Sequence, residues 1–189
     1  MVTAVLRVFL SLLVIMDPFG SIPIFLSSSK EIEKRWAASY SVGVASLVFF
    51  LFLFLGGALL ELLKIDLPSL QVAGGIILGA LALQLSLGLP PSKPRELRAF
   101  LALIGTPMLT GPGTIVSTML FVQEYGHLVV GLGGTLSLVT CWILLYLSTS
   151  IQRVLKDEGL EILSKIMGLL LTAIAVRLIT TGIKSLWSA

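Results

Sequence analysis

The chain has 189 residues, of which 56% are hydrophobic and 12% are charged, and its mean hydropathy is +1.04. Soluble domains carry about a quarter charged residues, so this composition excludes a soluble fold. The formal net charge of +3 indicates contact with the anionic lipid of a bilayer and not with nucleic acid, because the basic residues lie between apolar runs.

Six apolar runs follow one another along the chain, each long enough for the roughly 20 helical residues that cross a bilayer. The first run lacks a clustered basic segment and a small-residue cleavage site, so we expect a retained helix rather than a signal peptide. The connections are too short to hold a folded soluble domain, and they are 30–35, 64–66, 90–96, 123–126 and 152–159. The sequence therefore predicts an all-α membrane protein with one transmembrane domain, 1–189. The runs are 2–28, 37–63, 67–89, 98–122, 126–148 and 160–186.

Lysine and arginine are unevenly distributed between the two sides of this arrangement. The first, third and fifth connections carry nine of them, and the other side carries four. The positive-inside rule therefore predicts a multi-pass protein of the cell membrane with the odd-numbered connections in the cytoplasm and both termini outside. The nine are Lys30, Lys34, Arg35, Lys93, Arg95, Arg98, Arg153, Lys156 and Lys165, and the four are Arg7, Lys64, Arg177 and Lys184.

The first run contains the stretch Asp-Pro-Phe-Gly-Ser-Ile-Pro at residues 17–23. Two prolines with a glycine between them predict an unwound segment, because each proline removes a helical hydrogen bond. Asp17 is the only acidic residue near the middle of a run, where an ionisable group indicates substrate binding or proton transfer. Asp17 before Pro18 is also typical of the N-cap of a new half-helix, and the two roles are compatible. The binding candidates here are Asp17, Pro18, Phe19, Gly20, Ser21 and Pro23.

The fourth run contains a similar stretch at residues 105–114, Gly-Thr-Pro-Met-Leu-Thr-Gly-Pro-Gly-Thr. Unwound backbone in a bilayer is tolerated only inside protein or beside a watery cavity, so we expect the two stretches to face each other. Amides at a half-helix start suit a carboxylate, and carbonyls at a half-helix end suit an ammonium group or a small cation. Two kinks that only shape the packing are the alternative. The binding candidates here are Thr106, Pro107, Thr110, Gly111, Pro112, Gly113 and Thr114.

The two halves of the chain resemble each other. The prolines of both stretches are five residues apart, and a glycine precedes Gln84 in the third run and Arg177 in the sixth by nine residues. Because each half would contain three spans, the second half would enter the membrane from the opposite face. We therefore expect two inverted three-helix repeats, about 1–92 and 93–189, with helices 1 and 4 broken. Gln84 and Arg177 are candidate gating or pathway residues, although Arg177 could instead extend to the headgroups.

Several kinds of chemistry have no support in the sequence. Cys141 is the only cysteine and His127 the only histidine, so we expect no intramolecular disulfide, no metal site and no other cofactor. No Ser-His-Asp set, HExxH motif, P-loop or paired carboxylate occurs. We therefore expect no enzyme activity, and any transport has to be driven by an ion gradient or by the gradient of the substrate.

The stretches DPFGSIPIF (17–25), GTPMLTGPGTI (105–115) and GLLLTAIAVRLITTGI (168–183) resemble the MarC family of integral membrane proteins, within the lysine-exporter superfamily. The resemblance covers essentially the whole chain. It implies a transporter of small neutral amino acids such as glycine, alanine and serine, coupled to protons or sodium. In this interpretation Asp17 binds the ammonium group or carries the proton, and amides around 111–114 bind the carboxylate.

The sequence is also compatible with two other functions. An exporter of drug-like or other small metabolites predicts a wider apolar cavity. A membrane scaffold without transport predicts a closed interior and tolerance of the changes Asp17→Asn and Gly111→Ala. The glycine-rich helix faces are compatible with a homo-oligomer as well as with packing inside one chain.

Overall fold

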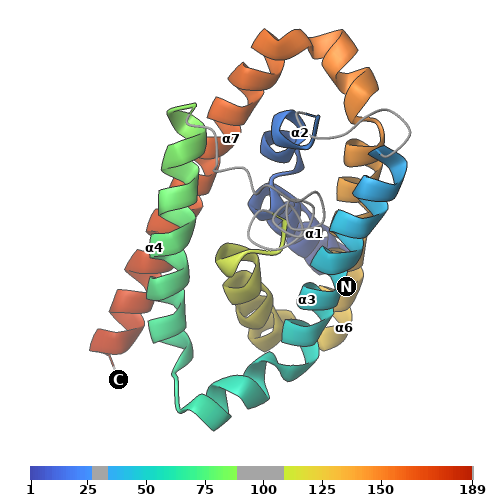
Figure 1. Ribbon diagram of the computed structural model, residues 1–189. Helices are drawn as coiled ribbons and strands as arrows, with labels where there is room; N and C mark the ends of the chain where they lie inside the picture. The colour runs from blue at the N-terminus through green and yellow to red at the C-terminus, as the bar shows by residue number, and fades with distance from the viewer. Residues whose placement is uncertain (27–33, 89–108, 189) are drawn as a thin grey trace.

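The computed structural model describes residues 1–26, 34–88 and 109–188, and within these ranges the regular structure is helical (Figure 1). Five stretches of the described residues are long and apolar enough to cross a membrane. The expected fourth run begins outside them, so six spans remain a prediction. The helices are α1 (Val2–Met16), α2 (Pro18–Leu26), α3 (Lys34–Leu63), α4 (Leu67–Ser86), α6 (Pro112–Tyr146) and α7 (Ser148–Trp187).

The interruption of the first span is much shorter than the sequence predicted. Only Asp17 leaves the helical conformation, with φ at 41° and ψ at 65°, and α2 begins directly after it. The prediction that residues 17–23 are unwound is therefore wrong. Pro18 takes the first helical position, where a missing N–H costs nothing. Only Pro23 therefore removes a helical hydrogen bond, the one to the Phe19 carbonyl.

Two expected polar connections are also shorter than predicted. Helix α6 runs through the expected connection 123–126 with one residue, Gly126, in a non-helical conformation at φ 79°. Helix α7 runs through 152–159 with a similar change at Lys156, where φ is 56°. These two residues turn the chain sharply, so each continuous element consists of two limbs. Glycine adopts a positive φ at little cost, which explains the position of the first turn.

The first limb of α6, before Gly126, lies between α3 and α4, and Figure 1 shows it in the middle of the molecule (olive). Its Val116 packs against Gly74 of α4, and its Met119 packs against Gly56 of α3. A methyl group at Gly74 would lie 2.5 Å from a methyl carbon of Val116. Small residues at these positions let the helices approach closely.

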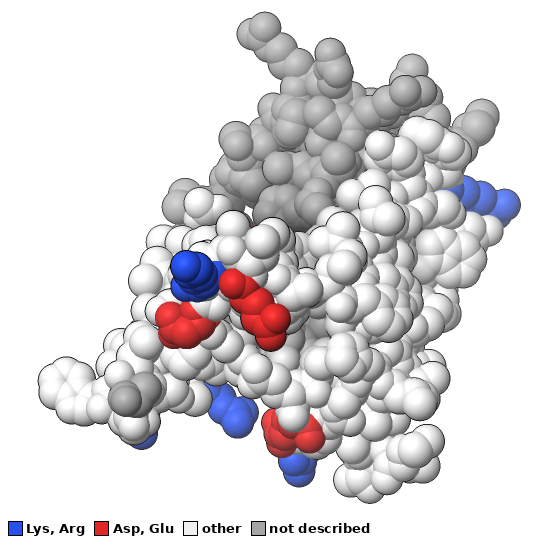
Figure 2. All heavy atoms as spheres, turned by 90° about the horizontal axis from the view of Figure 1, so that it is seen from below, with Lys and Arg blue, Asp and Glu red and all other residues white. Residues whose placement is uncertain are grey.

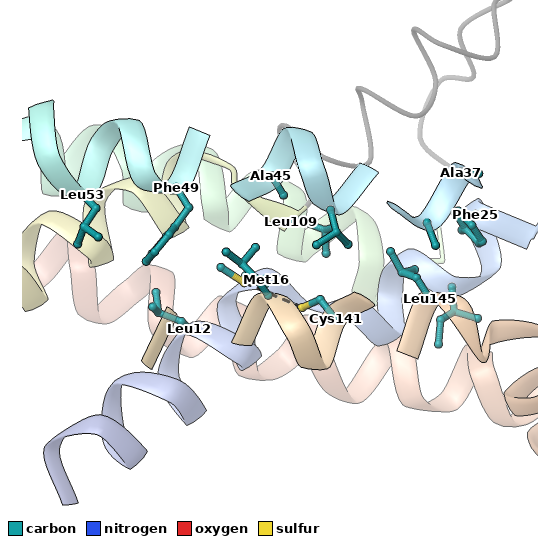
Figure 3. Packing of buried hydrophobic residues seen from close by; sticks show 14 of the residues in the cluster. Leu12, Met16, Phe25, Ala37, Ala45, Phe49, Leu53, Leu109, Cys141 and Leu145 are labelled. Atoms are coloured by element: carbon teal, nitrogen blue, oxygen red, sulfur yellow. Dashed lines mark hydrogen bonds between the residues drawn. The ribbon is translucent and has the colours of Figure 1, made fainter. Parts of the chain in front are cut away.

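The buried apolar residues form two clusters, and the larger one joins α1, α2, α3 and the second limb of α6 (Figure 3). In it Met16, Leu109 and Cys141 are fully buried, and the Cys141 and Met16 sulfurs are 4.0 Å apart. Large apolar side chains also point outward, for example Leu47 and Leu169, which are 70% and 69% exposed. Such outward apolar surface suits lipid. The smaller cluster contains Leu78, Ala82, Val116, Leu171, Ala175 and Leu178.

Candidate functional site

Asp17 is buried at the junction of α1 and α2, with 5% of its surface exposed. Its Oδ1 accepts a hydrogen bond from the Gly20 amide at 3.0 Å, so Asp17 caps the start of α2. Its Oδ2 is buried without a hydrogen-bond partner among the described residues. Buried polar groups nearly always have a partner, so one carboxylate oxygen is available to a ligand or a proton.

The neighbours of Asp17 fix the direction of its carboxylate. The Ser21 hydroxyl donates to the Asp17 carbonyl at 3.0 Å, which uses the hydroxyl proton inside the protein. A methyl group at Gly20 would collide with Oδ2, so only glycine leaves the carboxylate its observed position. Of the other candidates on α2, Phe19 is half-buried and packs against the larger cluster, whereas Pro23 is exposed.

The start of α6 has no comparable cap. Gly111 is the N-cap residue and Pro112 the first helical residue, and no side chain caps the first turn. Buried hydroxyls flank this start: Thr110 donates to the Ala45 carbonyl and Thr114 to the Leu109 carbonyl, both at 3.0 Å. Their protons are thus used within the protein, and the uncapped backbone provides the local positive potential.

The helix starts of α2 and α6 lie in the same part of the interior. Met16, which precedes Asp17, and Leu109, which lies before Gly111, belong to one cluster of fully buried residues (Figure 3). Cys141 of the second α6 limb contacts Met16 there. The structure therefore brings the described parts of the two candidate stretches together. Thr106 and Pro107 lie outside the described residues.

A cavity of about 700 Å³ lies between α1, α4, α6 and α7. Its lining runs from Arg7 to Ile15 on α1 and from Ser117 to Tyr125 on α6. Each of these two walls covers eight residue steps of helix, which rise ~12 Å, so both give a cavity depth of about 12 Å. Asp17 is two residues beyond Ile15, about 3 Å further along the axis by the same rise. The cavity therefore ends close to the start of α2, although Asp17 and Gly111 are not among the residues that line it.

The mouth of this cavity carries charge. Arg7 donates from Nη1 to the Tyr125 hydroxyl at 3.2 Å, which links α1 to the first α6 limb. Glu124 and Arg177 also line the cavity. Arg7, Tyr125 and Glu124 lie toward Gly126, and this end of the cavity is its mouth. Arg177 lies deeper in the cavity, on α7.

Comparison with known proteins adds the family to this geometry. The MarC family of integral membrane proteins matches residues 2–187. The chain belongs to the MarC family. A UPF0056 membrane protein of Aquifex aeolicus is 35% identical, over 95% of this chain and 92% of the relative. The UPF0056 inner membrane protein YhgN of Escherichia coli is 31% identical, over 92% of both chains. No solved structure matches the chain.

In this MarC protein the end opposite the cavity mouth is closely packed. Phe25 at the end of α2, Ala37 at the start of α3 and Leu145 at the end of α6 are fully buried in the larger cluster. Leu160 of α7 joins them and is 2% exposed. The described part of the molecule is thus open on one side of Asp17 and closed on the other.

The proposed pathway residues differ in their placement. Arg177 lines the cavity, whereas Gln84 is exposed on α4 and lies outside the cavity lining. Sequence reasoning did not single out Arg7, Gln71 or Ser117, which also line it. Each is a single polar residue in or near an apolar run, and this was the only available signal. Among the described residues no group of three His, Cys, Asp or Glu could hold a metal ion.

Asp66 provides a second acidic helix start, at α4 and outside the spans. Its carboxylate accepts from the Ser69 amide and the Ser69 hydroxyl, both at 2.9 Å. These hydrogen bonds, the amide first, hold the pKa of Asp66 below its ordinary value. Figure 2 views the molecule from below Figure 1 and shows a few charged side chains of both signs on a mostly uncharged surface.

Proposed function

We propose that this protein is a secondary transporter of small neutral amino acids that works by alternating access. The observation that carries the proposal is the buried Asp17 carboxylate with one oxygen free of partners, close to the end of a cavity. The cavity is open toward one end of the molecule, and the other end is packed. A pathway open to one side at a time is what alternating access requires.

The substrate would lie between the two helix starts. Asp17 would bind its ammonium group, and the first turn of α6 after Gly111 would bind its carboxylate. No second acidic residue is buried among the described residues, so nothing there would select a cationic side chain. Neutral amino acids, with glycine, alanine and serine as the first candidates, fit this arrangement. A proton or sodium ion could use the same carboxylate when substrate leaves.

Contacts between α4 and α7 support the inverted repeat. The repeat pairs Gly75 with Gly168 and Ala82 with Ala175, each 93 positions apart. A methyl group at Gly75 would lie 3.0 Å from the Ala175 carbonyl, and one at Gly168 would lie 3.0 Å from the Ala82 carbonyl. A two-fold axis relates such reciprocal contacts. With six spans and the distribution of basic residues, this supports both termini and the cavity mouth on the outer face of the cell membrane.

Uptake into liposomes that contain the purified protein tests the proposal. Radiolabelled glycine and alanine are offered under an inward proton gradient, an inward sodium gradient and no gradient. We expect saturable uptake that Asp17→Asn strongly reduces, because this variant keeps the cap and loses the charge. Absence of uptake for every neutral amino acid under all three conditions would contradict the proposal.

The volume of the cavity favours a second candidate function. About 700 Å³ is far more than glycine fills and lies within the roughly 300–1,000 Å³ of cavities that hold drug-sized ligands. An exporter of drug-like or other metabolites would use this space directly. In the same liposomes such an exporter would move a hydrophobic dye, and excess alanine would not compete with the dye.

A further inference from the structure

The cavity contains polar side chains that the proposed transport site does not use. Gln71 of α4 and Ser117 of α6 both line it, and they are 6% and 3% exposed. Neither side chain has a hydrogen bond to another described residue. A few polar side chains among apolar ones are typical of the lining of a ligand site.

The charged residues of the cavity are unequal in sign. Arg7 and Arg177 contribute two positive charges, and Glu124 contributes one negative charge. The bond from Arg7 to Tyr125 uses one of five guanidinium donors, which leaves the others available. The lining therefore favours a ligand that carries a negative charge, and planar guanidinium groups suit carboxylates in particular.

Helix contacts place Arg177 at the level of Ser117, at the deep end of the cavity, which we call its floor. Gly74 packs against Val116, the neighbour of Ser117, while Gly75 packs against Ala175 and Ile179 on either side of Arg177. The adjacent residues Gly74 and Gly75 therefore connect the α6 and α7 walls at one height. Arg177 and Ser117 can consequently act on one bound group.

We propose that this cavity is a binding site for organic carboxylates with an apolar body. Arg177 and Ser117 bind the carboxylate at the floor, with Gln71 as a further partner. Apolar residues between floor and mouth, among them Phe121 and Leu178, contact the rest of the ligand. The inference extends the proposed function, because the cavity is the entrance to the transport site, but it concerns larger ligands than glycine or alanine.

Binding of four related probes by calorimetry tests the chemistry. The protein in nanodiscs of zwitterionic lipid is titrated with L-leucine, 4-methylpentanoate, 3-methylbutylamine and decanoate. We expect the carboxylates to bind and the amine, which has the same apolar body as leucine, not to bind. Tighter binding of leucine indicates a ligand from water, and tighter binding of decanoate indicates one from the bilayer. Equal binding of the amine, or no binding of any carboxylate, overturns the proposal.

Variants locate the site. Arg177→Gln is expected to weaken carboxylate binding by about tenfold or more, the loss of one charge-assisted hydrogen bond. Ser117→Ala removes no charge and is expected to weaken it about fivefold. Lys184→Gln is the matched control on the same helix outside the cavity and should bind normally. Asp17→Asn should bind 4-methylpentanoate, which has no ammonium group, as wild type does even though alanine uptake is strongly reduced, which separates this inference from the transport proposal. Normal carboxylate binding by both Arg177→Gln and Ser117→Ala overturns the proposed carboxylate site.

Discussion

Two helices begin inside the molecule, and their starts differ in charge. Helix α2 follows Asp17, whose carboxylate caps the first turn through the Gly20 amide. Helix α6 follows Gly111, which has no side chain to offer, and its first turn carries no side-chain cap. The start of α2 therefore holds a carboxylate with one oxygen that has no hydrogen-bond partner. At the start of α6, no side chain compensates the positive end of the helix dipole.

Two motifs with the same proline spacing therefore need not have the same chemistry. Helix α2 begins at the first proline of its motif, Pro18, whereas α6 begins at the second proline of its own, Pro112. A symmetric pair of starts would suit two like charges. An acidic start beside an uncapped one suits a zwitterion, which has an ammonium group for the first and a carboxylate for the second.

The largest expected effect follows from removing the charge at the first start. Asp17→Asn should keep the helix cap, because asparagine caps as well as aspartate, and should reduce alanine uptake by about tenfold or more. Asp66→Asn is the matched control, since Asp66 also caps a helix but lies outside the spans. Initial uptake rates in liposomes measure the effect. Equal rates for both variants would show that Asp17 only caps α2.

Adding a cap at the second start gives the converse test. Gly111→Ser supplies an oxygen that competes with the substrate carboxylate for the first-turn amides of α6. We expect slightly higher thermal stability together with about fivefold weaker apparent affinity, the loss of roughly 1 kcal/mol. Gly57→Ser is the control, because nothing lies within 4 Å of a methyl group there. Unchanged KM for alanine in Gly111→Ser would exclude a carboxylate at this start.

A smaller effect is expected when the position of the Asp17 carboxylate is disturbed. In Gly20→Ala the new methyl group meets Oδ2, so the carboxylate has to turn and loses its bond to the residue 20 amide. The lost cap should lower the free energy of unfolding by about 1 kcal/mol. Gly57→Ala, in open space, should raise it by up to ~1 kcal/mol, since alanine favours helix. Unfolding in detergent compares the two, and a shift of the same sign in both contradicts this view of Gly20.

The sequence predicted the membrane-spanning helices better than it predicted the candidate site. The apolar runs 37–63 and 67–89 lie close to α3 (Lys34–Leu63) and α4 (Leu67–Ser86), because length and hydropathy decide these elements. The capping role of Asp17 was read from the Asp-Pro pair and is confirmed by the bond from Gly20. The unwound stretch was wrong because Ile22 and Phe25 are fully buried, and their packing keeps α2 helical past Pro23.

The cavity could not be predicted in the same way. Its polar residues come from four helices, and Arg7 and Arg177 are far apart in the sequence. A single polar residue in an apolar run does not reveal which helix it faces. Ser117 in particular looks like any small residue of a packed helix. Only the contacts of Gly74 and Gly75 with their neighbours show that it shares a level with Arg177.

The smallest expected effect concerns the second acidic helix start, Asp66. Because the pKa of Asp66 is lowered in the folded protein, its ionised form contributes stability above the unfolded value of about 3.9, and this contribution is lost as the pH falls through the folded pKa. Wild type should therefore have a higher Tm than Asp66→Ala at pH 7, and the difference should shrink below about pH 4. Thermal unfolding of both proteins at a series of pH values measures it. A difference that is constant with pH would mean that Asp66 caps α4 without its charge, so that Asp17 alone would be a helix start whose charge matters.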